Sequence, residues 1–497
     1  MTKIFYYIKK LFKVLGNLGI VAVREEMFMP TLFWSQLPAN FNYIKRFQKI
    51  SVDNVCNYTS LFNFPTGKLT GNYWGDSLIV LKSALDTPYF FSFHLEKNGN
   101  TLFIGPKNFK KTKYMNLFLM AATKQAKRII YIDNTNRSKI FINSLNGDYY
   151  FITRQESKRK LIINPFKMEN NPENMKFILN WLYQIIKRED DGMIKLDEND
   201  TGLEQEWEKL KNIIQNKKET INKIEDVFNI SKEEKFPNIC SILKKWVDQT
   251  RYGFIFNEEN TLDLFKNNIT GINLNSIVNN EELKVAVFDY IVHSLIQNSN
   301  GEPTILAIDE GWLLFDNAYF GPKIAEITKK LYDKNIAIVM TTSGADSYDS
   351  SYIQSSVKNI FPTQVFLPNV KATIYQRKIY NISEEESRIL SVMKESSGNI
   401  MLKHNGNSII SSIDFNFLKE EEQNIFTNGN IISNIMSESK ELINSDKAEN
   451  WLPLMMLLIK EYNKVKFEQK MKEREKRQIQ WEEAKQTGDN SAVLKSE

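Results

Sequence analysis

Seven short apolar runs limit most strongly what this chain can fold into. Each run is four or five residues long and mostly apolar throughout, which is typical of strands buried on both faces of a parallel sheet. A helical pattern at Thr112–Ala126 separates two of the runs, so the chain contains a strand, helix, strand unit. The sequence therefore predicts an α/β fold. The runs are Leu78–Leu81, Tyr89–Phe93, Thr101–Ile104, Ile129–Ile132, Thr304–Ile308, Ile336–Met340 and Gln364–Leu367.

The stretch between residues 170 and 300 differs in character, because charged helical segments replace the apolar runs. Helical patterns cover Asn174–Arg188, Leu203–Lys218 and Asn238–Asp248, and Ser231 stands three residues before Glu234, which is a capping-box spacing. These patterns predict an all-α insertion between two parts of a parallel sheet. We therefore expect five regions, at residues 1–80, 81–170, 171–300, 301–420 and 421–497, of which the second and the fourth build the sheet.

The last region begins after further helix and hairpin signals. Ser383 and Glu386 form a second capping-box spacing before a helix at Glu385–Met393. Two runs, Asn399–Lys403 and Ser408–Ile413, flank an Asn-Gly step and predict a β-hairpin. The stretch from residue 451 to residue 482 is helical, and it is highly charged beyond Lys460. It fits a solvated helix, with a docking arm for another protein as the alternative.

Composition argues against several classes of protein. A net charge of +5 is too small and too dispersed to indicate a nucleic-acid coat. The two cysteines and three histidines lie far apart, which argues against a disulfide scaffold and a structural zinc site. No apolar stretch approaches the ~18 residues of a membrane span, and lysines interrupt the N-terminal segment, which a signal peptide does not allow. We expect a cytoplasmic protein; the basic first segment leaves contact with an anionic membrane open.

The stretch 105–112, Gly-Pro-Lys-Asn-Phe-Lys-Lys-Thr, follows a predicted strand and opens a predicted helix. It fits the phosphate-loop pattern G-x-x-x-x-G-K-[ST] except at the second glycine, where Lys110 stands. In such a loop, backbone N–H groups and the helix N-terminus hold phosphates, while Lys111 neutralises them and Thr112 holds Mg²⁺. A non-glycine residue in left-handed backbone costs about 1–2 kcal/mol, so Lys110 is a defect. A basic turn at a helix start is the alternative.

The run Thr304–Ile308 ends in two carboxylates, Asp309 and Glu310. In phosphate-loop ATPases the first acid holds Mg²⁺ through water, and the second orients and deprotonates the attacking water. For the acid pair taken alone, a solvated turn is the alternative. Two such sites on neighbouring parallel strands, in this order, favour a nucleotide site.

Several short motifs spread over nearly the whole chain point to one family. The sequence resembles the CagE/TrbE/VirB family, the ATPases of type IV secretion and conjugal-transfer systems. Each motif is short, and the combination is specific. The stretches that carry the resemblance are Leu102–Pro106, Asp309–Leu314, Leu37–Asn40 with Arg46, Leu367–Asn369, Asn164–Phe166, Trp246 and Trp451–Pro453.

The resemblance implies a RecA-like P-loop NTPase core that uses ATP and Mg²⁺. It assigns ATP binding to Gly105, Lys111 and Thr112, the metal to Thr112 and Asp309, and catalysis to Glu310. It further implies a homo- or hetero-hexamer with other secretion components, peripheral at the cytoplasmic side of the inner membrane. Family members are longer at the N-terminus, so we interpret residues 1–80 as a remnant of that domain, in a short gene or in a fragment.

Three departures from the family pattern bear on the reaction. The two inner glycines of the phosphate loop are replaced by Asn108 and Lys110. Asp333 stands where relatives carry an arginine that could act as a finger, and an acid there would repel the charge of the transition state. Thr342 stands where relatives carry a glutamine that senses the γ-phosphate. Because an arginine finger alone can be worth ~10³ in rate, these losses predict weak or absent hydrolysis beside retained nucleotide binding.

Other functions stay open. A neighbouring subunit could supply the missing groups, which would make this chain a working motor, or the chain could be an inactive structural or regulatory subunit beside an active paralogue. A DNA-pumping motor is disfavoured, because Lys371, Arg377 and Lys378 lack an aromatic-basic stacking pattern.

Overall fold

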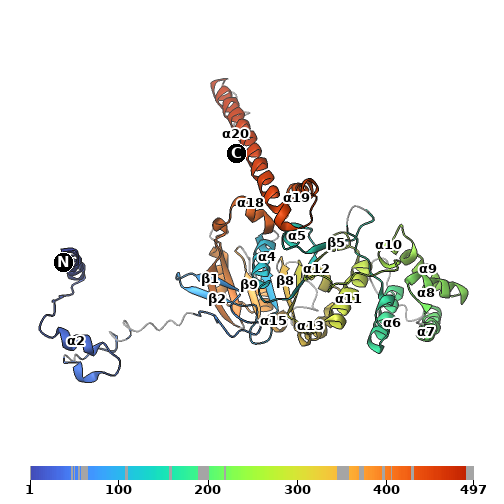
Figure 1. Ribbon diagram of the computed structural model, residues 1–497, viewed down its shortest axis with the longest axis horizontal. Helices are drawn as coiled ribbons and strands as arrows, with labels where there is room; N and C mark the ends of the chain where they lie inside the picture. Colours follow the sequence, from blue (N-terminus) through green and yellow to red (C-terminus); the bar gives the residue numbers. More distant parts are fainter. Residues whose placement is uncertain are drawn as a thin grey trace. The chain divides into compact units, whose positions relative to one another are not determined.

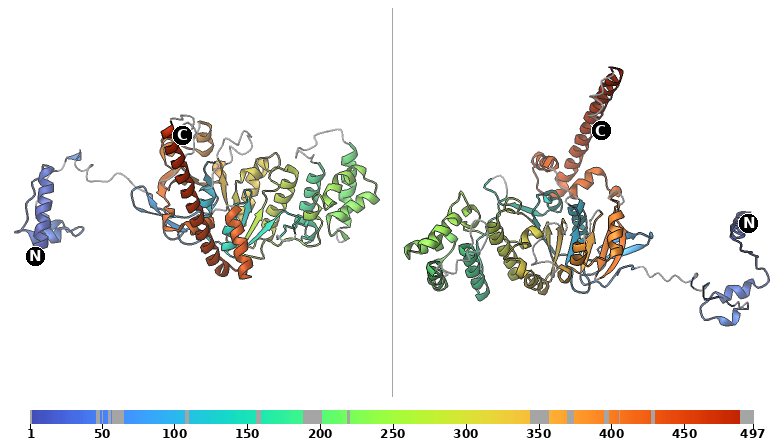
Figure 2. Two further views of the ribbon diagram at one scale, coloured as in Figure 1. Left: turned by 90° about the horizontal axis from the view of Figure 1, so that it is seen from above. Right: turned by 180° about the vertical axis from the view of Figure 1, so that it is seen from behind.

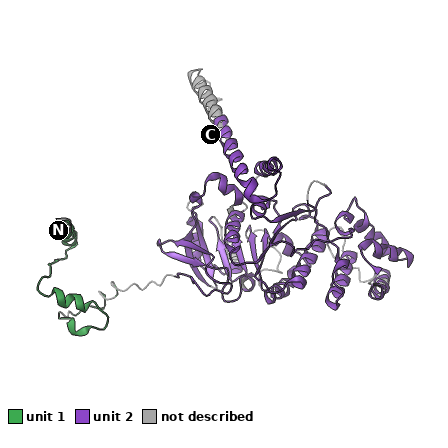
Figure 3. Ribbon diagram, in the orientation of Figure 1, with its two compact units in different colours: residues 1–64 green, residues 65–497 purple. Residues whose placement is uncertain are grey.

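A computed structural model of the protein describes most of the chain. The described residues are 2–45, 49, 51–53, 56, 65–106, 110–155, 159–187, 201–217, 220–343, 357–368, 374–394, 398–404, 406–426 and 430–487. The chain divides into two compact units, residues 1–64 and residues 65–497 (Figure 3). The first unit contains helices α1 (Thr2–Asn17) and α2 (Met29–Ser35) and a short turn η1 (Phe41–Tyr43).

An 11-stranded sheet runs through the second unit (Figure 1). Its strand order is β2-β1-β11-β10-β9-β3-β8-β7-β4-β6-β5. The strands from β9 to β5 pair in parallel, and the remaining four add antiparallel at one side. The strands are β1 (Ile79–Ser83), β2 (Pro88–Phe91), β3 (Thr101–Ile104), β4 (Arg128–Asp133), β5 (Asp148–Phe151), β6 (Ile269–Asn273), β7 (Thr304–Asp309), β8 (Ile336–Thr342), β9 (Thr363–Phe366), β10 (Asn399–His404) and β11 (Asn407–Ser412).

This order confirms the predicted α/β fold with a RecA-like parallel sheet. The predicted hairpin of β10 and β11 is confirmed as an antiparallel pair. One prediction is wrong: the strand of the phosphate loop, β3, and the strand of the acid pair, β7, are not neighbours, because β8 lies between them. Parallel pairing still brings the carboxyl ends of all three strands to one edge of the sheet.

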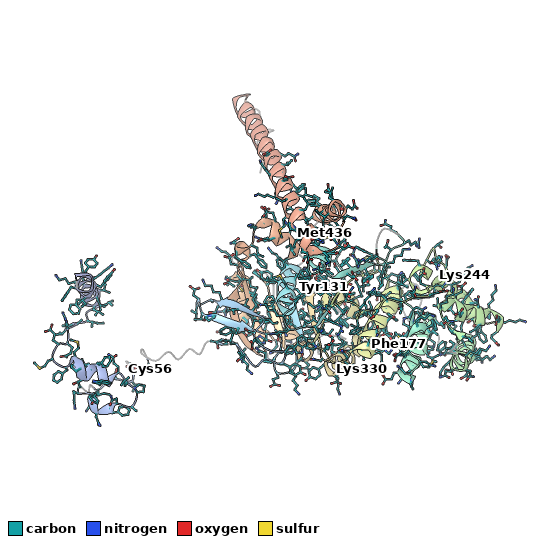
Figure 4. All side chains as sticks on the ribbon, in the orientation of Figure 1. Cys56, Tyr131, Phe177, Lys244, Lys330 and Met436 are labelled. Carbon is teal, nitrogen blue, oxygen red and sulfur yellow. The ribbon has the colours of Figure 1, made fainter. Side chains whose placement is uncertain are left out.

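Helices cover both faces of the sheet, and alternate residues of each central strand point into different cores. Phe103, Tyr131 and Val339 belong to a core shared with α4, whereas Leu102, Ile132 and Met340 belong to a core shared with α6, α11 and α13. Figure 4 labels Tyr131 of the first core and Phe177 of the second. The helices of this part are α4 (Lys110–Ala122), α5 (Lys139–Ser144), α11 (Glu281–Asn298), α12 (Trp312–Phe315), α13 (Ile324–Asp333), α15 (Val357–Ile360), α16 (Ile374–Tyr380), α17 (Glu384–Val392) and α18 (Glu420–Gln423).

A helical group follows β5 and lies to one side of the sheet in Figures 1 and 2. It packs around buried Trp181, Trp246 and Phe256, and the Lys245–Glu282 ion pair (2.8 Å) ties it to α11. The prediction of helix alone over residues 171–300 missed strand β6, which pairs with β4 and β5. The helices of the group are α6 (Pro172–Lys187), α7 (Thr201–Asn216), α8 (Ile224–Glu233), α9 (Pro237–Val247) and α10 (Gly253–Phe256).

The two predicted capping boxes have different outcomes. Ser383 caps α17 and exchanges hydrogen bonds with Glu386, as predicted. Ser231 lies inside α8 instead of starting a helix, and its hydroxyl donates to the carbonyl of Val227 (2.8 Å). That prediction is wrong, because a Ser-x-x-Glu spacing also occurs on the inner face of a continuing helix.

The C-terminal part consists of helices α19 (Asn430–Ile443) and α20 (Ala448–Thr487), which pack against each other. Trp451 is fully buried where they meet α5, and its indole N–H donates to the carbonyl of Asp446 (3.1 Å). Short 3₁₀ turns complete the unit: η2 (Pro165–Lys167), η4 (Gly321–Lys323), η7 (Phe415–Phe417) and η8 (Asn424–Phe426). Among the described helices, none is long and apolar enough to cross a membrane.

Gly311 connects β7 to α12 in very little space. A Cβ atom placed there would lie 2.0 Å from the sulfur of Met340 on β8. We predict that Gly311→Ala lowers the free energy of unfolding by about 1–3 kcal/mol, because the methyl group overpacks this contact. Urea denaturation of Gly311→Ala, Met340→Ala and the double variant measures the effect. Equal costs of the Gly311→Ala change in both backgrounds would contradict the steric explanation.

Candidate functional site

The residues predicted to bind nucleotide meet at the carboxyl edge of the parallel strands. Gly105 directly follows β3, and its N–H donates to the carbonyl of Thr342 on β8 (3.1 Å). Lys111 and Thr112 lie in the first turn of α4, and Asp309 ends β7. Residues 107–109 and the side chain of Lys110 lie outside the described part of the chain, so the predicted defects at Asn108 and Lys110 stay predictions.

Asp309 is fully buried, and three threonine hydroxyls hold its carboxylate. Thr112 Oγ1 donates to both carboxylate oxygens (3.0 and 3.2 Å), and Thr341 Oγ1 donates to Oδ1 (2.6 Å). Thr135 Oγ1 donates to Oδ2. In the described part of the chain these direct partners are neutral, so they orient the carboxylate without balancing its charge.

A second buried acid, Asp133, lies beside Asp309. The parallel register of β4 and β7 places the two residues directly opposite each other. The Asp133 carboxylate accepts hydrogen bonds from the backbone N–H groups of Thr135 (3.0 Å) and Ser138 (2.8 Å) and from the Tyr149 hydroxyl (2.7 Å). Burial, followed by the charge of Asp133, raises the pKa of Asp309 to about 6.

The side-chain oxygen atoms of Thr112 and Asp309 are suitable ligands for a magnesium ion. Mg²⁺ prefers hard oxygen ligands and keeps several waters, and Thr112 and Asp309 present a hydroxyl and a carboxylate within hydrogen-bond distance of each other. A cation near Asp309 would also relieve the unfavourable burial of two neighbouring carboxylates. The residues present therefore fit a magnesium ion held by Thr112 and Asp309.

Lys111 is buried with no exposed side-chain surface, and its ammonium forms an ion pair with Glu310. Ser343 joins this pair: its hydroxyl accepts from Lys111 Nζ and donates to Glu310 Oε1 (2.7 Å). Burial lowers the pKa of Lys111, and the Glu310 carboxylate opposes that effect. The predicted phosphate lysine and the predicted catalytic acid are therefore bound to each other in this structure.

Glu310 has an unusual backbone conformation, with a φ of 49° in the left-handed region. A non-glycine residue costs about 1–2 kcal/mol there. Its N–H donates to Thr341 Oγ1 (2.8 Å), which helps to hold this conformation. Strained backbone of this kind gathers at functional sites. At Glu310 this left-handed conformation ends the strand, and the side chain contacts Lys111.

A cavity of about 590 Å³ opens beside Glu310 and Ser343, a size typical of sites for small molecules. Its walls come from the carboxyl ends of β4, β7 and β8 and from the start of α11. Its lining carries both signs of charge, because it includes Lys284 from α11 and Glu310 from the end of β7. Its polar lining includes Thr135, Arg137, Glu281, Lys284, Glu310 and Ser343.

Asp333 lies away from the edge of the sheet that carries the site. Asp333 ends α13 before β8 begins, whereas the contacts with Asp309 and Glu310 come from the other end of β8. Seven residues of strand at about 3.3 Å each separate the two ends by roughly 20 Å. Asp333 instead lines a separate cavity with Lys330 and His293. It therefore does not act on the site of its own chain.

Sequence reasoning missed four polar residues of the site: Asp133, Thr135, Thr341 in its contact with Asp309, and Ser343. The available signal was their position, because each follows or ends a predicted parallel strand at the edge that carries the site. Their contacts depend on strand order, which a single sequence does not provide.

We predict that Asp309→Asn stabilises the nucleotide-free protein at pH 8 and has little effect near pH 4. The folded-state pKa of about 6 lies above the ordinary value of 3.8, so ionisation of Asp309 destabilises the folded state as pH rises through this window. The free energy of unfolding should rise at pH 8 by on the order of 3 kcal/mol, because each unit of pKa shift corresponds to about 1.4 kcal/mol. Urea denaturation at both pH values measures it; a variant that is less stable at both would contradict this account.

Comparison with known proteins shows which proteins this chain is similar to. The model of the CagE, TrbE, VirB family, described as a component of type IV transporter system, matches residues 2–46. The type IV secretion system protein virB4 of Bartonella henselae is 26% identical over 421 residues, covering 84% of this chain and 52% of that protein. The type IV secretion system protein PtlC of Bordetella pertussis is 22% identical, covering 81% of this chain and 51% of that protein.

The chain thus spans about half the length of the curated relatives it matches. Among solved structures, that of VirB4 of Thermoanaerobacter pseudethanolicus covers 71% of this chain and 99% of its own, with a TM-score of 0.56 at 15% identity. This likeness supports the fold described above. Residues 2–46 thus resemble the CagE, TrbE, VirB family, and most of the chain is similar to type IV secretion system proteins.

Proposed function

We propose that this chain is the ATP- and Mg²⁺-binding ATPase domain of a type IV secretion or conjugal-transfer system. One observation carries the proposal: Lys111, Thr112, Asp309 and Glu310 meet at one edge of a RecA-like sheet through direct contacts. Two parts of the chain almost 200 residues apart supply these groups, in the arrangement that phosphate binding and metal binding require.

Each residue has a distinct role in this proposal. Gly105 starts the phosphate loop and leaves room for Leu367, since a Cβ there would lie 2.9 Å from Leu367 Cδ1. Lys111 binds the phosphates with its ammonium. Thr112 and Asp309 hold Mg²⁺, which would neutralise charge on the phosphates when bound. Glu310 orients the attacking water and accepts its proton.

We further propose that this chain hydrolyses ATP only weakly. Asn108 and Lys110 replace loop glycines, and Lys111 is engaged by Glu310, so nucleotide must break a buried ion pair before both residues can act. Asp333 lies at the opposite end of β8 from these residues, and in this proposal it would face the site of a neighbouring subunit. The alternative is a catalytically inactive structural or regulatory subunit paired with an active paralogue.

The relatives' names bear on the partners of this chain. Their names place them in type IV secretion systems. We propose that this chain likewise works with other secretion components, in a homo- or hetero-hexamer on the cytoplasmic face of the inner membrane. Residues 81–170 and 301–420 would form the motor core, residues 171–300 an insertion, residues 421–497 a C-terminal helical region, and residues 1–80 an N-terminal region. We propose no nucleic-acid partner for this chain.

We predict that the chain binds MgATP and that Lys111→Ala weakens binding by tenfold or more, because the buried ammonium is the main charge available to the phosphates. Steady-state hydrolysis by the chain should lie near that of Lys111→Ala, which also controls for contaminating ATPases. Binding is measured by titration calorimetry. Turnover far above the Lys111→Ala background would make the chain an active motor and overturn the weak-hydrolysis part alone.

We predict that Thr112→Val reduces the dependence of ATP binding on Mg²⁺. The valine keeps the shape of the side chain but removes the hydroxyl that meets Asp309. Removing Mg²⁺ should weaken binding to the unaltered chain by tenfold or more, and binding to the variant much less. Thr123→Val, at an exposed threonine just beyond α4, is the matched control. Equal Mg²⁺ dependence in all three proteins would exclude Thr112 as a metal ligand.

A further inference from the structure

A second cavity lies where the C-terminal helices α19 and α20 meet the rest of the second unit. Its volume is about 600 Å³, which is typical of sites for small molecules. One wall comes from α5, β5 and the turn between them, and the other wall comes from α19 and the start of α20. Met436 on α19, which Figure 4 labels, belongs to the second wall. We call the boundary between these two walls the C-terminal seam.

Polar contacts contribute much of what holds the C-terminal seam together. Among the described buried residues, the apolar cluster of α19 and α20 includes one from outside these helices, Ile140 on α5. Two hydrogen bonds cross the seam beside it. Lys440 Nζ donates to Asn143 Oδ1 (2.6 Å), and the backbone N–H of Ala448 donates to Asn146 Oδ1 (2.7 Å). A ligand that binds both walls of the cavity would therefore add substantially to this contact.

Lys440 has a largely buried charge that its protein partners balance only in part. Its side chain is 19% exposed, and its hydrogen bond at 2.6 Å goes to the neutral amide of Asn143. Its carboxylate partner Asp446 lies 3.5 Å away, on a side chain that is 75% exposed. Burial lowers the pKa of Lys440, and the charge of Asp446 opposes that effect. An anion in the cavity would stabilise this ammonium.

The lining of the cavity has more positive than negative side chains. Arg159 forms ion pairs with Asp148 and with Asp446 (3.4 Å), so two of the acids are already engaged. Lysines contribute from both walls, which suits a ligand with more than one negative charge. A phosphate group has that charge and several acceptor oxygens, and lysine is a common phosphate binder. The charged lining residues are Lys139, Arg159, Lys440 and Lys447, and Asp148, Asp446 and Glu449.

We propose that this cavity binds a small anion with a phosphate group, and that the bound anion holds α19 and α20 against α5 and β5. Lys139 and Lys440 bind the phosphate oxygens from the two walls. This inference does not depend on the proposed nucleotide site, because Glu310 lines a different cavity. A free phosphate compound and a lipid headgroup share this chemistry, and experiment can separate them.

Amide hydrogen exchange at Ala448 reports on the C-terminal seam, because this N–H donates across it. We expect pyrophosphate without Mg²⁺, at ten times its dissociation constant, to slow exchange in the peptide that contains Ala448 by about tenfold. Mass spectrometry measures the rate. Lys440→Met keeps the length of the side chain and should abolish the slowing. Lys460→Met, at an exposed lysine of α20 outside the cavity, is the matched control and should keep it.

A second arm replaces pyrophosphate with vesicles of phosphatidylglycerol. Slowing by pyrophosphate assigns the phosphate to a free anion, and slowing by vesicles alone assigns it to a lipid headgroup. The absence of slowing with both probes would overturn the inference, and so would equal slowing in Lys440→Met and the unaltered chain.

Two further variants keep the test decisive. Slowing that disappears in Lys111→Ala would place the anion at the nucleotide site and overturn the inference, whereas failure of nucleotide binding alone would leave it standing. If Lys440→Met does not fold, Lys139→Met on the opposite wall decides. We expect it to weaken pyrophosphate binding by about threefold or more, and unchanged binding would contradict the proposal.

Discussion

The buried carboxylate of Asp309 is the charge on which the arrangement of this site depends. Its position at the end of β7, opposite Asp133 on β4, places two acids side by side in the interior. Three threonine hydroxyls from α4, the loop after β4 and β8 converge on it. Each of them fixes one structural element relative to the others. The cost of burying this charge is a reason for the site to take up a cation.

The second charged group, Lys111, is linked to the same edge of the sheet through Glu310 and Ser343. Its burial would be unfavourable without the carboxylate, since an unpaired ammonium loses its hydration. The strained backbone of Glu310 keeps that carboxylate within reach. Nucleotide phosphates would offer Lys111 a stronger partner, and Glu310 would then face water in the adjoining cavity. The ion pair thereby connects the two halves of the proposed reaction, binding and water activation.

Much of this fold was predictable from the sequence, because its central strands are continuous apolar runs and its hairpin contains an Asn-Gly step. Strand β6 was missed, since Ile269–Asn273 is short and lies among charged helical segments. The separation of β3 from β7 and the position of Asp333 depend on strand order, which a local pattern does not carry. Lys111, Thr112, Asp309 and Glu310 were recognisable from motifs. Asp133 and Ser343 have no motif and became visible only when parallel register placed them beside those residues.

The central claim is that Lys111 exchanges its internal partners for nucleotide phosphates. A crystal structure of the chain with Mg²⁺ and a non-hydrolysable ATP analogue tests it most directly. The account predicts phosphates at Lys111, a metal ion between Thr112 and Asp309, and a Glu310 carboxylate released from the lysine. An intact Lys111–Glu310 ion pair, with the nucleotide absent or bound elsewhere, would contradict it.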